Sequence, residues 1–203
     1  MSDHNKGDEK PSRTDILWVC DCSNSMKGKG KSGSMNTMIR EIIQELNENP
    51  PDSSLFEVNM RALKFFDTAE WINLSFIPVK NFSWIDLVPG GNSKLGDAFK
   101  LINEEFKQQN LNKDNYDKYQ LLLILITDGY PTDDWIPEFE DMKDVLNSYN
   151  PVYCLIRIQD TSDDIVSAFA GEGNNKDLRI MTCDDIENII QLVRLAEKNN
   201  MSN

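Results

Sequence analysis

Short apolar runs alternate along this chain with segments of helical periodicity. Residues 121–126 are six consecutive apolar residues, and residues 16–20 form a second continuous apolar run. Runs of this length predict strands that are buried on both faces, as in a parallel sheet. Between such runs apolar side chains recur three and four residues apart, as in residues 35–46, which is typical of an amphipathic helix. The alternation predicts a doubly wound α/β fold with right-handed crossovers.

The predicted sheet has six strands and is mostly parallel, with one antiparallel edge strand. Residues 56–66 and 71–76 flank a turn at Asp67 and Thr68, and we expect them to form a hairpin at the edge of the sheet. The other expected elements are helices at residues 95–106, 137–149, 163–170 and 184–198 and strands at residues 152–158 and 178–181.

The length of 203 residues predicts one domain. Residues 1–14 are polar, charged and aperiodic. Such a segment cannot offset its ordering entropy by burial, so we expect a disordered N-terminal arm. The expected domain spans residues 15–198 and leaves a short tail at 199–203.

The net charge of the chain limits which kinds of molecule we expect it to bind. The chain carries 34 Asp and Glu against 21 Lys and Arg, a net charge of -13. Nucleic acids and anionic membranes need a cationic surface, so we expect neither as a partner. The acidity favours a cation or a basic protein instead.

Cysteine and histidine usage indicates the compartment and limits the chemistry. The four cysteines form no framework of close spacings, and the N-terminal residues lack the apolar centre of a signal peptide. We therefore expect a cytoplasmic protein with reduced thiols. The single histidine, His4, lies in the polar arm, which argues against a zinc site and against a catalytic imidazole.

Polar oxygen donors follow the two most apolar runs. Asp21, Ser23 and Ser25 occupy alternate positions after the first run, so they point the same way in an extended loop. Asp128 ends the second run, and Ser93 follows a Gly-Gly-Asn turn. Carboxylates and hydroxyls are hard ligands that suit Mg²⁺, Mn²⁺ or Ca²⁺. Each piece alone is also typical of a turn or a helix cap, but all of them are expected at one edge of the sheet.

These motifs resemble the metal-ion-dependent adhesion site (MIDAS) of von Willebrand factor A domains. The resemblance rests on Asp21-x-Ser23-x-Ser25, on Ser93 in Gly90-Gly91-Asn92-Ser93-Lys94-Leu95-Gly96, and on Thr127-Asp128-Gly129. It covers about residues 15–198. Within the family, residues 21–26 and 127–135 are similar to the bacterial TerY-type proteins associated with tellurite resistance and stress response.

The resemblance implies a ligand set and a kind of partner. Ser23 and Ser25 would bind the metal directly, and Asp21 and Asp128 would hold it through water. The open coordination position would take an Asp or Glu carboxylate of a partner protein. Ser93 stands where the family usually has Thr and keeps the hydroxyl. We prefer Ser93 to Asn92, which could offer a carbonyl oxygen, because Leu95 and Gly96 follow Ser93 at the expected distance.

Two alternatives stay open. The first is a P-loop-like nucleotide hydrolase that uses Lys31 and Asp128, although Ser25 stands where a P-loop needs its first glycine. The second is a relative of the family that has lost metal binding. No nucleophile and base pair is evident in the sequence, so we expect no enzyme.

Four large side chains near the predicted site complete the expectations. Trp135, Tyr130 and Trp84 fall in loops or at element ends, where an aromatic side chain can either anchor a partner or cover the edge of the core. Met26, beside the first motif, is expected to fill a gap in the core.

Overall fold

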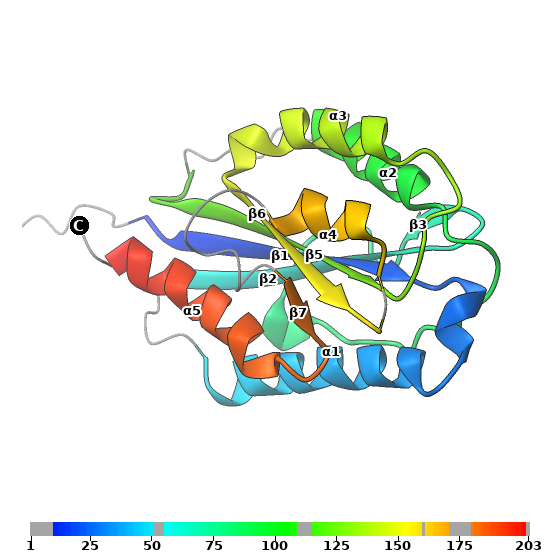
Figure 1. Ribbon diagram of the computed structural model, residues 1–203. Helices are drawn as coiled ribbons and strands as arrows, with labels where there is room; N and C mark the ends of the chain where they lie inside the picture. The colour runs from blue at the N-terminus through cyan, green and yellow to red at the C-terminus, as the bar shows by residue number, and fades with distance from the viewer. Residues whose placement is uncertain (1–9, 51–54, 109–114, 160, 171–179, 202–203) are drawn as a thin grey trace, which may run out of the picture.

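The doubly wound α/β fold is confirmed by the computed structural model, which describes residues 10–50, 55–108, 115–159, 161–170 and 180–201 (Figure 1). The strands are β1 (Ser12–Asp21), β2 (Phe56–Phe65), β3 (Ala69–Trp71), β4 (Ile77–Pro78), β5 (Tyr119–Thr127), β6 (Pro151–Arg157) and β7 (Ile180–Thr182). The helices are α1 (Lys31–Glu48), α2 (Leu95–Gln108), α3 (Ile136–Leu146), α4 (Asp163–Ala170) and α5 (Ile186–Met201), with short 3-10 turns η1 (Asn24–Lys27), η2 (Val79–Asn81) and η4 (Asn147–Tyr149).

The sheet is mostly parallel and has an antiparallel edge. Its order is β3-β2-β1-β5-β6-β7, and β4 also pairs with β2. The described sheet thus has seven strands instead of six, because the edge strand expected at residues 71–76 is wrong: β3 and β4 take its place, and residues 72–76 lie in neither strand. The division has a local cause in the segment between β3 and β4. There the Asn73 Oδ1 accepts the Ala62 N–H of β2 at 2.8 Å, so a side chain takes the place of a main-chain partner.

Two hydrophobic layers cover the faces of the sheet. In β1, Trp18 and Cys20 pack with one layer, while Leu17 and Val19 pack with the other. This alternation follows from the strand period of two. In Figure 1, α1 and α5 lie against one face, and α2, α3 and α4 lie against the opposite face. No helix in the described ranges is both long and apolar enough to cross a bilayer.

Two boundaries differ from those expected. β1 begins at Ser12, so residues 12–14 belong to the sheet and not to an N-terminal arm. They are held there because Ser12 pairs with Phe56 of β2, and the Arg13 side chain pairs with Asp15 at 2.7 Å. The last helix runs to Met201, beyond the expected end at residue 198. Residues 1–9, 178–179 and 202–203, on which other predicted boundaries fall, lie outside the described residues.

The chain order creates a switch point between β1 and β5. From β1 the chain continues through α1 to β2 on one side, and from β5 it continues through α3 to β6 on the other. α1 and α3 therefore leave these two strands toward opposite faces of the sheet. In open α/β sheets ligands bind at the carboxyl ends of the strands at such a point. Asp21 ends β1, and Asp128 directly follows β5.

Candidate metal site

Three loops meet at the carboxyl ends of β1 and β5. They are the loop after β1, the glycine-containing loop before α2, and the loop after β5. Main-chain hydrogen bonds join them, so the side chains that they carry are held at one place. The bonds run from Gly90 N to Cys22 O at 2.7 Å, from Asn24 N to Gly91 O at 2.9 Å, and from Thr132 N to Ser93 O at 2.7 Å.

Asp21 is fully buried and accepts hydrogen bonds from all three loops or their strands. Its Oδ1 accepts the Ser23 N–H at 2.8 Å. Its Oδ2 accepts the hydroxyls of Thr127 at 2.7 Å and of Ser93 at 3.2 Å. The carboxyl group of Asp21 is therefore the point that ties the three loops together.

A second chain of hydrogen bonds runs from Ser23 to Asp128. Ser25 donates its hydroxyl proton to Asp128 Oδ1 at 2.7 Å, and the hydroxyl oxygens of Ser23 and Ser25 are 2.8 Å apart. A hydroxyl has one proton to give, so Ser23 is the donor to Ser25. Lys31 completes the chain, since its ammonium donates to Asp128 Oδ2 at 2.5 Å.

Two buried carboxyl groups share this site, and burial governs their electrostatics. Burial raises the pKa of the Asp21 carboxyl, and the nearby charge of Asp128 raises it further. Hydrogen bonds from Ser23 and Thr127 to the ionised form lower the pKa of Asp21 and oppose this effect. A positive ion between the two carboxylates would relieve the same electrostatic cost.

The oxygen atoms fit a hard cation. Adjacent ligands of an octahedral ion with bonds of about 2.0–2.1 Å lie about 2.9 Å apart. The Ser23 and Ser25 hydroxyl oxygens are 2.8 Å apart, so both could ligate one ion with little movement of the loop. The donors are two carboxylates and four hydroxyls, and within the described ranges no cluster of three or more His, Cys, Asp or Glu side chains is placed to hold a metal.

The five residues predicted as ligands come together in the structure. The hydrogen bonds given above link Asp21, Ser23, Ser25, Ser93 and Asp128. Asn92 lies apart from them, because both its backbone and its side-chain amide donate to Asp67 Oδ1, at 3.0 and 2.7 Å. Ser93 is thus the residue of this loop whose hydroxyl bonds to Asp21, and its role as a ligand stays a prediction.

Sequence reasoning missed the roles of two residues at this site. The Thr127-Asp128-Gly129 motif predicts no role for Thr127 itself, yet its hydroxyl holds Asp21. A hydroxyl that ends an otherwise apolar strand is the signal that could have identified it. Lys31 was considered only as part of a nucleotide-binding loop, and its contact with Asp128 spans 97 residues of sequence.

The aromatic side chains near the site divide into two kinds. Trp135 is only 7% exposed and packs on Phe99 and Phe139, so it covers the core. Trp84 is half-buried and donates its indole N–H to Asn36 Oδ1 at 2.9 Å. Tyr130, by contrast, is 68% exposed two residues after Asp128 and is free to contact a partner. Met26 is fully buried and fills the core, as expected.

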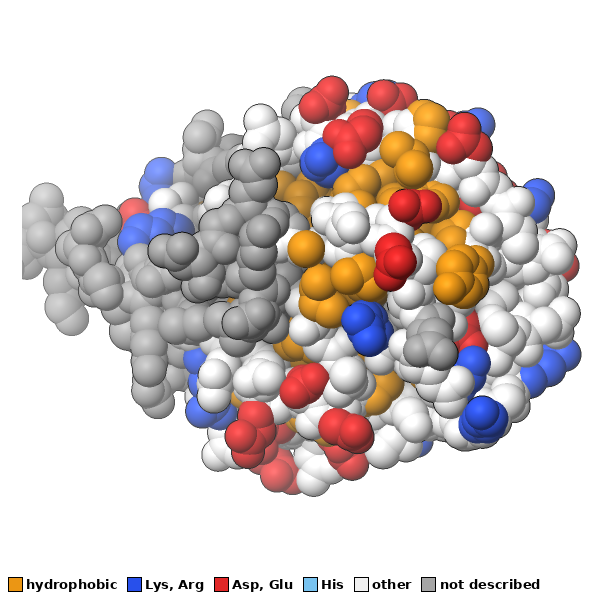
Figure 2. All heavy atoms as spheres, in the orientation of Figure 1, with side chains coloured by type: hydrophobic (Ala, Val, Ile, Leu, Met, Phe, Trp, Pro, Cys, Tyr) orange, Lys and Arg blue, Asp and Glu red, His pale blue; other side chains and the backbone are white. Residues whose placement is uncertain are grey.

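Basic side chains occur in two of the loops at the site, although the chain as a whole is acidic. Lys27 and Lys29 are exposed in the loop after β1, and Lys31 and Lys94 are half-buried nearby. In Figure 2 basic side chains stand along the lower right of the molecule, where Figure 1 places the loop between β1 and α1. Acidic side chains lie against the same loops, since Asp67 accepts the Asn92 N–H and Asp133 accepts the Gly96 N–H, so both signs of charge are present at this end of the sheet.

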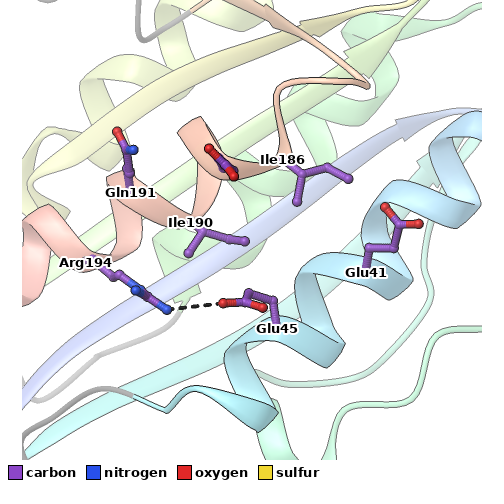
Figure 3. A pocket seen from close by; sticks show the side chains of 7 residues that line it. Glu41, Glu45, Ile186, Ile190, Gln191 and Arg194 are labelled. Carbon is purple, nitrogen blue, oxygen red and sulfur yellow. Dashed lines mark hydrogen bonds and ion pairs between the residues drawn. The ribbon is translucent and has the colours of Figure 1, made fainter.

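A separate groove of about 380 Å³ lies between α1 and α5. Figure 3 shows Arg194 of α5 facing Glu45 of α1, and the two side chains form an ion pair at 3.3 Å. None of the five predicted ligands lines this groove. The lining residues are Glu41, Glu45, Ile186, Glu187, Ile190, Gln191 and Arg194.

Comparison with known families identifies the class of protein. The family model of the von Willebrand factor type A domain matches residues 15–195, which is most of the chain. The protein therefore belongs to the von Willebrand factor A family, whose domains are typically binding modules without catalytic activity. A comparison with curated protein sequences gives no match.

Solved structures share the fold at low sequence identity. Proximal thread matrix protein 1 from the mussel byssus, with a zinc-occupied MIDAS motif, has a TM-score of 0.60 and 18% identity over 93% of this chain and 46% of its own. The manganese-loaded TRAP protein of Plasmodium vivax has a TM-score of 0.59 and 13% identity, over 89% of this chain and 73% of its own. A von Willebrand factor type A protein from Catenulispora acidiphila has a TM-score of 0.60 and 13% identity over 91% of this chain and 43% of its own. This chain thus spans less than half the length of the mussel and Catenulispora proteins.

Proposed function

We propose that this protein is a metal-dependent protein-binding module. A divalent cation, Mg²⁺ or else Mn²⁺ or Ca²⁺, would bind at the carboxyl ends of β1 and β5. It would supply an open coordination position for an Asp or Glu carboxylate of a partner protein. The proposed ligands are Asp21, Ser23, Ser25, Ser93 and Asp128.

One observation carries the proposal. The hydroxyl oxygens of Ser23 and Ser25 are 2.8 Å apart, which is the spacing of adjacent ligands around a small hard ion. Two buried carboxylates flank them, so the site attracts a cation. The zinc-occupied MIDAS motif of the mussel protein and the manganese loaded on the Plasmodium protein support a metal site here by analogy.

The metal favours a carboxylate as the partner's group, because hard divalent cations prefer carboxylate oxygens. Lys27 is exposed in the loop after β1, and a positive charge near a binding site raises the association rate of an anionic ligand. Tyr130, which is 68% exposed, offers an aromatic contact beside the metal position.

The branch of the family and the compartment are part of the same proposal. The resemblance of residues 127–135 to TerY-type proteins supports a role in bacterial tellurite resistance or stress response. The buried cysteines Cys20 and Cys22 are free thiols, which suits a cytoplasmic location.

A nucleotide hydrolase is the second candidate, because Lys31 and Asp128 are in contact as such an enzyme would need. The loop between β1 and α1 disfavours it. A P-loop cradles phosphates with free backbone N–H groups, but here Met26 N–H bonds to Ser23 O and Lys31 N–H bonds to Gly28 O. An ATP hydrolysis rate that Lys31→Ala abolishes would favour the enzyme over the binding module.

Calorimetric titration with Mn²⁺ tests the proposed function. Wild type should bind one ion, and Ser25→Ala should bind at least about tenfold more weakly, which is about 1.4 kcal/mol, because a direct ligand is lost. Ser34→Ala is the matched control, since Ser34 is an exposed serine of α1. Repeating the titration in acetate at equal ionic strength probes the open position, because a bound carboxylate must raise the affinity for the metal. Equal heats from wild type and Ser25→Ala would exclude the site.

A further inference from the structure

Lys31 places a positive charge among the proposed ligands. It is the first residue of α1, and it follows Lys29 and Gly30, whose φ angles of 52° and 74° lie in the left-handed region. The side chain is only 14% exposed, and its ammonium lies 2.5 Å from Asp128 Oδ2, on a carboxyl group that is fully buried. The ammonium is therefore held inside the site and does not extend into solvent.

Both carboxylate oxygens of Asp128 already accept a hydrogen bond within the chain. Oδ1 accepts the proton of Ser25, and Oδ2 accepts from Lys31, so each oxygen already has a donor. Asp21, by comparison, is satisfied by neutral donors. Of the two carboxylates at the site, Asp128 has a cationic partner within the chain.

A metal ion at the Ser23 and Ser25 oxygens would meet this ammonium. The hydroxyl of Ser25 lies 2.7 Å from Asp128 Oδ1, on the carboxyl group whose other oxygen carries Lys31. Like charges a few ångströms apart in a partly buried site repel each other, and the double charge of a divalent ion doubles the repulsion that a univalent ion would meet. The ammonium and the metal ion therefore bind to the same carboxylate and repel each other.

We propose that Lys31 is an internal cation that competes with the divalent metal for Asp128, so that loading the site requires the ammonium to leave this carboxylate. The inference rests on the proposed function, since it takes the metal site as given. In the absence of metal, Lys31 neutralises a buried charge and stabilises the fold. In the presence of metal, the same ammonium lowers the affinity of the site.

Lys31→Met in the 203-residue chain tests the competition, because Met keeps most of the length and the apolar character of the lysine stem and removes the charge. Mn²⁺ should bind the variant at least tenfold more tightly than wild type, and the variant should melt at a lower temperature than wild type in the presence of a chelator. Lys29→Met makes the same change on an exposed side chain in the same loop and should alter neither quantity. Lys31→Arg keeps the positive charge and should therefore bind Mn²⁺ as weakly as wild type does.

The opposite signs of the two effects distinguish competition from a purely structural role, which would weaken both metal binding and folding. If wild type binds Mn²⁺ and Lys31→Met binds it no more tightly, this inference fails and the metal site stands. If wild type, Lys31→Met and Lys29→Met all fail to bind Mn²⁺, the proposed function and this inference fail together. Binding by Lys31→Met alone would support competition strong enough to suppress the site.

A measurement on wild type keeps the test independent of how the variant folds. The side-chain NMR signals of Lys31 should move toward those of exposed lysines when diamagnetic Mg²⁺ saturates the site, because the ammonium leaves Asp128. Lys29, which is already exposed, serves as the internal reference. Lys31 signals that stay unchanged while Mg²⁺ binds would overturn the competition.

Discussion

Replacing Thr127 by Val removes two hydrogen bonds at the centre of the site, a short one to the Asp21 carboxylate and a longer one from Gly129, and keeps the shape of the side chain. The Thr127 hydroxyl donates to Asp21 Oδ2 at 2.7 Å, and it also accepts the Gly129 N–H at 3.3 Å. Thr127 is 1% exposed and Asp21 is fully buried, so water cannot take over the lost bonds. Asp21 keeps the Ser23 N–H and the Ser93 hydroxyl as donors.

The expected cost follows from the charge of the acceptor. A hydrogen bond to a charged group contributes about 1.5–3 kcal/mol to stability. A domain of this size loses about 2–4 °C of melting temperature for each kcal/mol, so Thr127→Val should melt about 3–12 °C below wild type in the presence of a chelator. Its affinity for Mn²⁺ should fall as well, because Asp21 is then held less firmly.

The matched control is Thr132→Val. The Thr132 hydroxyl donates to the Ser93 carbonyl at 3.1 Å, but Thr132 is exposed and its own N–H keeps a bond to the same carbonyl at 2.7 Å. This bond is neutral and solvated, so its loss should cost about 0.5–1 kcal/mol at most. Urea unfolding of wild type and both variants measures the difference. Equal, small losses for the two variants would refute the reasoning, since the Asp21 carboxyl would then not depend on Thr127.

Two other features of the structure give predictions about the backbone and the thiols. Gly91→Ala should cost about 1–2 kcal/mol and weaken Mn²⁺ binding, because Gly91 has a φ of 74° and an added Cβ would lie 2.5 Å from Asp67 Oδ2. Gly90→Ala, where an added Cβ meets nothing within 4 Å, should be mild in thermal melting, and equal losses would contradict this. Burial raises the pKa of Cys22 to about 12 and that of Cys183 to about 11, so neither thiol should label quickly at pH 8. Cys22 is buried and should react only after unfolding, and its rapid alkylation in the native protein would contradict the burial of the loop after β1.

Much of the fold could be predicted because its elements are set by local periodicity. The helix at Asp163–Ala170 has the bounds that its pattern predicted, and residues 121–126 lie within β5 at the centre of the sheet. Continuous apolar runs leave few alternatives to a buried strand. The divided edge could not be predicted, because it depends on the Asn73 side chain pairing with the main chain of β2.

Arg61 shows a second limit of periodicity. It lies in β2 and is only 1% exposed, and a pattern based on hydrophobicity does not place a charge there. Its guanidinium bonds to Glu105 at 2.9 Å and stacks 3.6 Å above the Trp71 ring. Partners this far apart in sequence are brought together only by the tertiary fold.

The candidate site also has a part that the sequence predicts and a part that it does not. The carboxyl ends of buried parallel strands meet at one edge of a sheet, so the sequence alone predicts that Asp21 and Asp128 lie close together. The donors that hold them could not be assigned in this way. Thr127 acts through a hydrogen bond across 106 residues of sequence, and Lys31 acts through an ion pair across 97.

The most direct test of the central claim is a crystal structure of the protein soaked with Mn²⁺, with anomalous diffraction used to locate the ion. The account predicts one strong anomalous peak at the carboxyl ends of β1 and β5, within about 2.2 Å of the hydroxyl oxygens of both Ser23 and Ser25, with Asp21 and Asp128 around it. An ion bound elsewhere, or no ion at these two serines at saturating Mn²⁺, would contradict it.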